Sequence, residues 1–361
     1  MPAYKKKVLK HSYSDAIALS ASLESKKNRP EVCYTKKESA NNGDEPSMIN
    51  DKRILVTGGS GVIGRQLLSL LAGDNAEVLS IDREPLECVA PDVIKRGVKH
   101  IEADLAEASL EPIRDFAPQV VFHLAAGFER SSESPGFWHR NWQDNTLLSH
   151  RMVELAGQLP DLEVFVFASS YLIYAKELYM HEGTPGTARY LTESDTVSPR
   201  NVTGASKYYT ERELQFVNEV VNPSLRCVNA RIYRVFGRGS KDVVSRWIRM
   251  ALDGQVAEVY NKENAFDFIY AAEVAEGLYR LACSGAARGV INLGSGVLTT
   301  IAQVLDILGA QLGMRYIDKG ITERIERSGA NLERLKAAVG WLPSLSVGEG
   351  IRRVIEYERA K

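Results

Sequence analysis

Hydrophobic residues from position 51 onward gather in short runs, and these runs alternate with segments of helical spacing. Two of the helical segments are Val62–Leu71 and Asn145–Gly157. The short runs are rich in Val, Ile and Phe, as buried strands are, and comprise Arg53–Thr57, Glu77–Asp82, Val98–Ala103, Gln119–Ala125, Glu163–Ala168 and Arg226–Arg231. This alternation predicts an α/β fold: a doubly wound parallel (Rossmann) sheet with helices on both faces and a ligand at the carboxyl ends of its strands.

The alternation weakens after Arg231, and this change predicts the domain organisation. Residues 51–231 are expected to form the sheet domain. Residues 232–361 are expected to form mainly a smaller substrate-binding lobe, with 267–290 returning to the sheet domain. Residues 1–50 precede the pattern, and their polar end from Lys36 to Ser47 predicts a flexible extension. A lid or an oligomer contact is the alternative role for this extension.

Composition narrows the class of protein. Hydrophobic residues make up 44% of the chain, charged residues 25%, and the net charge is −1. This balance favours neither nucleic acid nor an anionic membrane as a partner, and no apolar run reaches the roughly 18 residues of a membrane span. The four cysteines, at positions 33, 88, 227 and 283, have no metal-ligand spacing. We therefore expect reduced thiols in a cytoplasmic protein without a metal centre.

A glycine-rich turn follows the first predicted strand. Gly58, Gly61 and Gly64 are three residues apart, with Val62 and Ile63 between the last two. The first glycine allows a tight turn, the second lets backbone N–H groups approach a pyrophosphate, and the third lets the helix pack closely on the strand. The spacing therefore predicts a dinucleotide cofactor.

An acidic residue at the end of the second predicted strand indicates which dinucleotide is bound. Asp82 lies 18 residues after Gly64, close to the spacing of about 20 expected for a ribose-binding acid. A carboxylate there accepts a hydrogen bond from a ribose 2′-OH and repels a 2′-phosphate, which favours NAD. The neighbouring Arg83 leaves the alternative of a contact to the 2′-phosphate of NADP.

Further segments follow in a fixed order: Ala103-Asp104-Leu105, Leu124-Ala125-Ala126, Ala168-Ser169-Ser170 and Asn201-Val202-Thr203-Gly204-Ala205-Ser206-Lys207. With the glycine turn they resemble the extended short-chain dehydrogenases/reductases, which include the NAD-dependent nucleotide-sugar epimerases and dehydratases. The resemblance covers about residues 52–357. It implies that Asp104 and Leu105 lie near adenine, and Leu124, Ala125 and Ala126 beside the pyrophosphate and ribose. It adds Asn145, Ala168, Lys207 and Tyr233 to the cofactor residues; for Asn145, an ordinary helix N-cap is the alternative.

The chemistry departs from the family pattern at one position. The family carries Tyr-x-x-x-Lys, and the residue four before Lys207 is Thr203. The resemblance implies that Ser170 hydrogen-bonds the reacting oxygen and that Lys207 orients NAD. A threonine hydroxyl is a poor general base, so the proton acceptor is expected elsewhere. Tyr171 is the first candidate and a water beside Lys207 the second.

Several functions stay open from the sequence. Sugar dehydratases carry Asp-Glu after the hydroxyl residue and the decarboxylases a Glu, whereas this chain has Tyr171-Leu172. The main expectation is therefore an epimerase that acts on a nucleotide-activated sugar through transient oxidation. The alternatives are a net NAD-dependent dehydrogenase or reductase, a family branch with proton transfer elsewhere on the substrate, and an NAD-binding pseudoenzyme or regulatory protein.

The expected substrate lobe also departs from the family. Arg234 and Arg238 replace an Asn and a Pro of the family pattern, and Phe266 replaces a phosphate-contacting Arg. Arg324 or Arg327 matches a late phosphate-binding Arg. These residues predict an anionic substrate, a nucleotide sugar or a similar small molecule; a surface ion pair is the alternative for Arg234 or Arg238.

The resemblance also implies a homodimer with an isologous interface of helices. The helices are those beginning near Asn145 and carrying Lys207. Met152, Val153 and Phe216 are the expected contributors, with the core of the monomer as their alternative place.

Overall fold

The computed structural model describes residues 49–127, 134–182, 187–320 and 324–361. Residues 46–361 form one compact unit. The predicted extension 1–50 therefore lies almost entirely outside the described residues. None of the helices in the described ranges is both long and apolar enough to cross a membrane.

A seven-stranded parallel sheet forms the centre of the fold, in the order β12-β8-β5-β4-β1-β2-β3. Its strands are β1 Arg53–Thr57, β2 Glu77–Asp82, β3 Lys99–Glu102, β4 Val120–His123, β5 Val164–Ser170, β8 Arg226–Ile232 and β12 Gly289–Leu293. All six predicted strands are present with small shifts at their ends, and the doubly wound fold is confirmed. The seventh strand, β12, was not predicted; it closes one edge of the sheet by pairing with β8.

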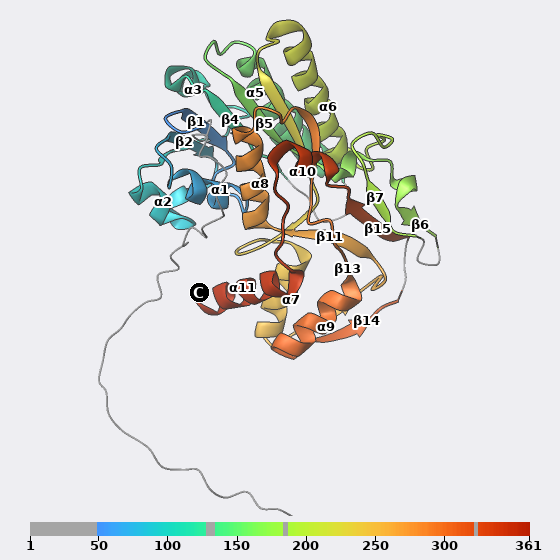
Figure 1. Cartoon of the computed structure of the whole chain (residues 1–361). Helices are drawn as coiled ribbons and strands as arrows, with labels where there is room; N and C mark the ends of the chain where they lie inside the picture. The colour runs from blue at the N-terminus through green and yellow to red at the C-terminus, as the bar shows by residue number, and fades with distance from the viewer. Residues whose placement is uncertain (1–48, 128–133, 183–186, 321–323) are drawn as a thin grey trace, which may run out of the picture. The chain divides into compact units, whose positions relative to one another are not determined.

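Helices cover both faces of this sheet (Figure 1). On one face, α1 (Gly64–Leu71) and α8 (Ala271–Cys283) pack against Ile54 and Val56 of β1. On the other, α5 (Leu148–Ala156) and α6 (Val202–Phe216) pack in the cluster that contains Leu55. Successive residues of a strand point to opposite faces, so β1 contributes to both cores. Burial on both faces explains why these strands read as continuous apolar runs.

Shorter elements connect the strands of this sheet. They include α2 (Pro91–Lys95), α3 (Glu111–Phe116) and α4 (Pro135–Asn141). Ser134 caps α4 by accepting a hydrogen bond from the Phe137 N–H. The helix continues through a π-helical turn at Trp142–Leu147 into α5, so α5 starts later than the predicted segment.

A second lobe is built on a sheet of order β13-β11-β15-β6, to which β7 and β9 are joined. Its strands are β6 Met180–His181, β7 Arg189–Leu191, β9 Arg234–Phe236, β11 Ala265–Tyr270, β13 Leu298–Thr300 and β15 Ile325–Ala330. Helices α7 (Val243–Leu252), α9 (Ile301–Leu312) and α11 (Val347–Arg359) share a core with β11, and β10 (Val256–Val259) pairs with β14 (Arg315–Asp318). The last short helix, α10 (Glu333–Val339), packs on α8 and β12.

The two lobes are interleaved along the chain, which corrects the predicted division at residue 231. β6 and β7 precede that position but pair with β15 of the second lobe. Conversely, α8 and β12 follow it but belong to the first sheet and its helices. Within and just after the segment 267–290, α8 packs against the first sheet, β12 extends to Leu293, and β11 pairs in the second sheet. No single cut separates the lobes.

Candidate active site

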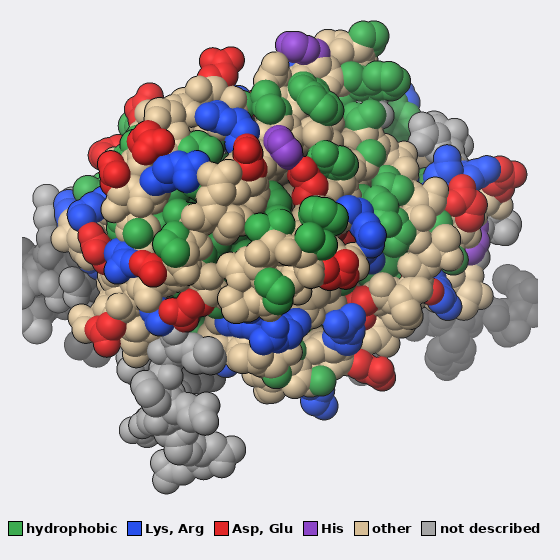
Figure 2. Space-filling view, turned by 90° about the horizontal axis from the view of Figure 1, so that it is seen from above, with side chains coloured by type: hydrophobic (Ala, Val, Ile, Leu, Met, Phe, Trp, Pro, Cys, Tyr) green, Lys and Arg blue, Asp and Glu red, His purple; other side chains and the backbone are tan. Residues whose placement is uncertain are grey.

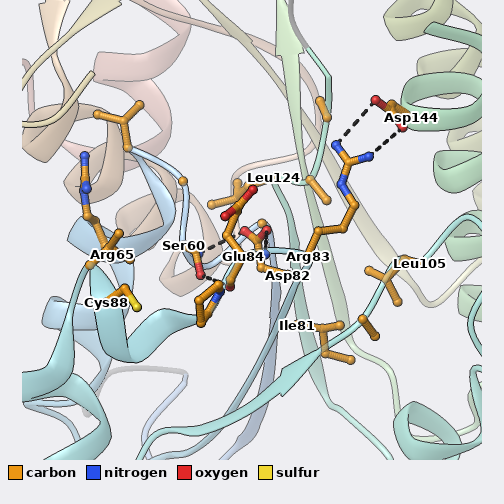
Figure 3. Close-up of a pocket in the computed structure, with 18 of the residues that line it drawn as sticks. Ser60, Arg65, Ile81, Asp82, Arg83, Glu84, Cys88, Leu105, Leu124 and Asp144 are labelled. Atoms are coloured by element: carbon orange, nitrogen blue, oxygen red, sulfur yellow. Dashed lines mark hydrogen bonds and ion pairs between the residues drawn. The ribbon is translucent and has the colours of Figure 1, made fainter. Parts of the chain in front are cut away.

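A cavity of about 680 Å³ lies at the carboxyl ends of β1, β2 and β4 (Figure 3). This is the edge at which doubly wound sheets bind their ligands, and the volume suits a cofactor. Predicted residues that line it are Gly58, Gly61, Val62, Asp82, Arg83, Leu105, Leu124, Ala125 and Ala126. Other lining residues were not predicted from the sequence; they include Ser60, Arg65, Asp144 and Lys241.

The glycine turn allows a close approach of three backbone segments. Gly58 has φ +76°, and a Cβ there would lie 2.6 Å from the Ala125 backbone N after β4. A Cβ on Gly64 would lie only 2.1 Å from the Gly58 carbonyl oxygen. Side chains at these positions would force the turn apart, so the glycines have the packing roles that dinucleotide binding requires.

Asp82 is held at the mouth of this turn by backbone donors. Its Oδ2 accepts from the Ser60 N–H at 3.0 Å and its Oδ1 accepts from the Glu84 N–H at 3.1 Å. Arg83 turns toward Asp144, to which its Nη1 donates at 3.0 Å, and it lies 3.6 Å from Asp104. Figure 3 shows this pairing across the cavity. The Arg83 guanidinium already has two carboxylate neighbours, which weakens the NADP alternative.

We expect Asp82→Ala to weaken NAD binding about 10- to 150-fold, the equivalent of one charge-assisted hydrogen bond of about 1.5–3 kcal/mol. NADP binding is expected to change less, so the preference between the two cofactors narrows. Titration calorimetry with both cofactors measures the effect, and Asp92→Ala, in an exposed pair with Lys95, is the matched control. A wild-type protein that prefers NADP would contradict the role of Asp82.

Other predicted cofactor residues have structural roles in the protein itself. Asn145 lies inside the π-helical turn, so the N-cap alternative is wrong. Its side-chain amide instead forms two hydrogen bonds with the backbone of Gly127, which follows β4. The Oδ1 accepts from the Gly127 N–H at 2.8 Å, and the Nδ2 donates to the Gly127 carbonyl at 2.9 Å. Asp104 accepts a hydrogen bond from the Ala106 N–H. The predicted residues that do not line the cavity are Ile63, Gly64, Asp104, Asn145, Ala168, Lys207 and Tyr233.

The end of β5 and the first half of α6 carry the expected catalytic residues. Ser170 ends β5 and accepts from the Leu172 N–H at 3.2 Å. Asn201 caps α6, and a Cβ on Gly204 would lie 2.6 Å from the Leu172 carbonyl oxygen, so helix and strand end are in close contact. Thr203 and Lys207 are one turn apart on α6, both buried. That Thr203 takes the place of a catalytic tyrosine stays a prediction.

Tyr171 is poorly suited to be the proton acceptor, contrary to the expectation from sequence. It is 4% exposed, stacks on Tyr233 with ring centroids 4.9 Å apart, and donates from its hydroxyl to Glu326 Oε1 at 3.0 Å. Burial raises the pKa of the Tyr171 phenol, and the Glu326 carboxylate raises it further, although Arg234 and Arg200 oppose this. A base must lose its proton readily, whereas this phenol is held in its protonated form.

Glu326 is the centre of a buried ionic cluster that sequence reasoning missed. Arg200 donates to its Oε2 at 2.8 Å and Arg234 at 3.3 Å, and Ser328 donates to Oε1 at 2.8 Å. Burial raises the pKa of Glu326, but Arg234 and Arg200 outweigh burial and hold it at about 2. Two guanidiniums share one carboxylate, so the cluster carries one excess positive charge.

Arg234 and Phe266, two positions at which the sequence departs from the family pattern, are in contact in the structure. The Arg234 guanidinium lies over the Phe266 ring, 3.7 Å from its centroid, so a positive charge stands where the family pattern has its arginine. Arg327 is partly buried in the same strand, β15, as Glu326. By contrast, Arg324 pairs with the exposed Glu182, and the Arg238 backbone carbonyl accepts a hydrogen bond from Arg65. Neither Arg324 nor Arg238 is part of the Glu326 cluster.

The fold and the cavity are those of a dinucleotide-binding protein, and the chain is similar in sequence to known proteins of this class. Residues 54–294 match the family described as "NAD dependent epimerase/dehydratase family". A putative UDP-glucose 4-epimerase of Methanocaldococcus jannaschii is 26% identical over 315 residues, which are 84% of this chain and 97% of that protein.

Two solved structures are similar to this chain at the same sequence identity. The structure of MoeE5 in complex with UDP-glucose and NAD has a TM-score of 0.72 and 26% identity, and covers 85% of this chain and 99% of its own. A UDP-N-acetylglucosamine 4-epimerase from Methanobrevibacter ruminantium M1, in complex with UDP-N-acetylmuramic acid, has a TM-score of 0.72 and 26% identity over 86% of this chain and 99% of its own.

The chain belongs to the NAD-dependent epimerase/dehydratase family, whose model matches well over half of its length. NAD is accordingly its cofactor. The residues fit that group: the glycine turn leaves room for a pyrophosphate, and Asp82 offers a carboxylate to a ribose hydroxyl.

Proposed function

We propose that this protein is an NAD-dependent epimerase of a nucleotide-activated sugar. The observation that carries the proposal is that the Ser170 hydroxyl and the first turn of α6 meet at the same sheet edge as the NAD cavity, in a chain of this family. NAD, held by the glycine turn and Asp82, would supply reversible hydride acceptance for a ring carbon of the sugar. Ser170 hydrogen-bonds the oxygen of that carbon, and the Glu326 cluster supplies positive charge to an anionic substrate.

An assay of both epimers tests the proposal. The purified protein is incubated separately with UDP-glucose and UDP-galactose, and with their N-acetylated counterparts, and the sugars are identified by NMR. We expect conversion in both directions without a stoichiometric rise in NADH absorbance. Equimolar NADH production would instead indicate a net dehydrogenase, and NAD binding without turnover of any sugar in a broader nucleotide-sugar panel would contradict an enzymatic role.

Arg234 tests how the substrate anion is bound. We expect Arg234→Ala to weaken nucleotide-sugar binding about 10- to 150-fold, through loss of a charge-assisted contact of about 1.5–3 kcal/mol. NAD affinity is expected to stay the same, since Arg234 is not part of the cavity lining. Calorimetry with the nucleotide sugar and with NAD measures the two affinities. Arg280→Ala is the control, because Arg280 of α8 also has its guanidinium over an aromatic ring, that of Trp341. Unchanged sugar affinity would remove Arg234 from the substrate site.

We also propose a homodimer. Large apolar side chains are exposed on α4 and the π-helical turn after it, and on α6 and a second π-helical turn, Val217–Val221, that follows α6: Trp138, Trp142, Tyr209, Phe216, Val220 and Val221. Figure 2, which looks down on the end where α5 and α6 lie, shows apolar side chains gathered on one side of that face. Such a patch suits a self-complementary interface. Met152 and Val153 are buried in the monomer core, so only Phe216 of the three expected contributors is exposed.

Phe216→Glu is expected to turn a dimer into a monomer, because an isologous interface buries the introduced charge twice. Sedimentation velocity at micromolar concentration measures this. Ile317→Glu places the same charge on another exposed apolar residue, on β14, and should leave the dimer intact. A monomeric wild-type protein would reject the interface.

The proposed location is the cytoplasm. Cys88 and Cys227 form no disulfide among the described residues, and a reducing compartment keeps thiols in that state. Cell fractionation of the full chain tests this.

A further inference from the structure

The wall of the NAD cavity includes a segment of the second lobe. This segment is the β9–α7 loop, residues 237–242, which connects β9 to α7. Three of its residues line the cavity: Gly239, Ser240 and Lys241. Arg65, in the first turn of α1, lines the cavity as well. A cofactor held by the glycine turn is therefore enclosed partly by the lobe that is expected to bind the substrate.

The Arg65 guanidinium holds the β9–α7 loop against α1. Its Nη2 donates a hydrogen bond to the Arg238 carbonyl, and a Cβ on Gly239 would lie 2.7 Å from the same nitrogen. Gly239 also has φ +64°, in the left-handed region that favours glycine. The turn of the loop and its close contact with α1 thus both depend on the absence of a side chain at position 239.

The β9–α7 loop is fixed within the second lobe as well. The Ser240 N–H donates to the Gly237 carbonyl at 3.1 Å, and the Ser240 carbonyl accepts from Arg249 of α7 at 3.0 Å. Arg249 in turn forms an ion pair with Glu358 of α11 at 3.1 Å. The loop is therefore a preformed wall, and Lys241 extends from a backbone that is held on both sides.

Two cations of the cavity lining, Lys241 and Arg65, have no carboxylate partner in the part of the chain that the structure describes. Lys241 is exposed, and Arg65 donates to the uncharged Arg238 carbonyl. The third cation, Arg83, is bound to Asp144, on the opposite side of the drawn site from Arg65 (Figure 3). NAD carries its negative charge on the pyrophosphate, and the glycine turn places that group at the start of α1. A cation on the loop that is held against α1 complements this charge.

We propose that the second lobe completes the NAD site: Lys241 contacts the pyrophosphate, and Arg65 is a positioning residue that holds the loop carrying Lys241. In this arrangement, Asp82 and Glu84 at the end of β2 face the ribose side of the cofactor. Release of the cofactor requires the loop to separate from α1, so the cofactor stays bound from one turnover to the next. The proposal rests on NAD as the cofactor and is independent of the reaction proposed above.

Three ligands test the contact of Lys241 with the pyrophosphate: NAD, ADP-ribose and adenosine. We expect Lys241→Met to weaken NAD and ADP-ribose binding about 10-fold, the size of one charge-assisted contact, and to leave adenosine binding unchanged because adenosine has no phosphate. NMR titration measures the weak adenosine affinity and calorimetry the other two. Lys336→Met, at an exposed lysine of α10, is the control. Unchanged NAD affinity, or an equal loss for adenosine, overturns the role of Lys241.

Salt provides an independent readout of the same contact. Ions screen a contact between exposed charges, so the wild-type affinity for NAD should fall as salt rises. In Lys241→Met this dependence should be weaker, because one of the two charges is gone. An equal salt dependence in both proteins would show that the ammonium group does not act on the pyrophosphate.

The dissociation rate of NAD tests the positioning role of Arg65. We expect Arg65→Met to speed dissociation about 10-fold in stopped-flow displacement, and Arg65→Lys, which keeps a donor for the Arg238 carbonyl, to recover part of the loss. Arg96→Met is the matched control, because the Arg96 guanidinium also donates to a backbone carbonyl of α1, that of Ser69, but does not line the cavity.

A double variant shows whether Arg65 acts through Lys241. If Arg65 holds the loop so that Lys241 can reach the cofactor, Arg65→Met should add little to the loss already caused by Lys241→Met. Additive losses of NAD affinity would overturn the positioning role of Arg65.

The glycine of the loop offers a second way to separate it from α1. Gly239→Ala places a methyl group 2.7 Å from the Arg65 guanidinium, and we expect it to weaken NAD binding as Arg65→Met does. Gly254→Ala is the matched control, because Gly254 has a similar φ of +68° but a Cβ there meets no atom within 4 Å. Equal effects of the two alanines would show that backbone strain, and not the contact with Arg65, determines NAD binding.

These ligand measurements do not depend on turnover of a sugar. If they give the expected losses in a protein that converts no nucleotide sugar, the role of Lys241 stands and the proposed function falls. If the protein epimerises a nucleotide sugar while Lys241→Met binds NAD as the wild type does, the proposed function stands and the role of Lys241 falls.

Discussion

Glu211→Ala is expected to destabilise the protein by about 3–5 kcal/mol, because it leaves a buried guanidinium without its carboxylate. Arg231 and Glu211 are each 3% exposed and share two hydrogen bonds. Ser169 of β5 would lose its acceptor as well. The ion pair therefore joins α6, β5 and β8, and its loss should loosen all three. Chemical denaturation followed by circular dichroism measures the free energy of unfolding.

Glu182→Ala is the matched control for this change. It also removes a carboxylate from an arginine pair, but the Glu182 side chain is 78% exposed, and exposed pairs contribute about 0–1 kcal/mol. If the two variants lose similar stability, the buried ion pair is not what holds α6 to the sheet.

Gly64→Ala is expected to weaken NAD binding at least about 100-fold, or about 2.7 kcal/mol. The added methyl group would lie 2.1 Å from the Gly58 carbonyl oxygen and 2.7 Å from the Gly59 Cα, and both are backbone atoms. The turn must open, which displaces the N–H groups that face a pyrophosphate. Fluorescence titration with NAD measures the loss.

Gly309→Ala serves as its control, because a Cβ there meets no atom within 4 Å. In the middle of α9 this change should leave NAD binding intact and raise stability slightly, since alanine favours helix more than glycine does. NAD affinity retained in Gly64→Ala would show that the turn tolerates a side chain.

The central sheet could be predicted from the sequence because its strands are buried on both faces. β1 and β2 coincide with the predicted runs for this reason. β12 has the sequence Gly-Val-Ile-Asn-Leu, whose glycine and asparagine interrupt the apolar run. Asn292 is nevertheless fully buried, because its amide is bonded to the Tyr174 hydroxyl and the Leu191 carbonyl. These hydrogen bonds depend on residues 118 and 101 positions away along the chain, so they leave no local signal in the sequence.

Some residues of the site could be predicted from the sequence and others could not, for a similar reason. The glycine turn and Asp82 are local features with a fixed spacing, so they could be placed in advance. The Glu326 cluster joins Arg200, Arg234 and Tyr171, which come together only when β15 of the second lobe meets the segment that follows β5 of the first sheet. The same cluster explains why Tyr171 is a poor base although it follows Ser170 directly. The burial of Lys207 is likewise a property of the packed fold.

The position of β12 has a consequence for how the chain is made. β8 pairs with β5 on one side and with β12 on the other. Along the chain, β12 comes long after β8, because elements of the second lobe lie between them. During synthesis, β8 therefore emerges from the ribosome as an open edge, with backbone N–H and C=O groups ready to pair with any passing strand. The edge of β8 is paired only after residues 289–293 have been synthesised and have formed β12. Until then, the nascent chain is at its most prone to pair with strands of other chains.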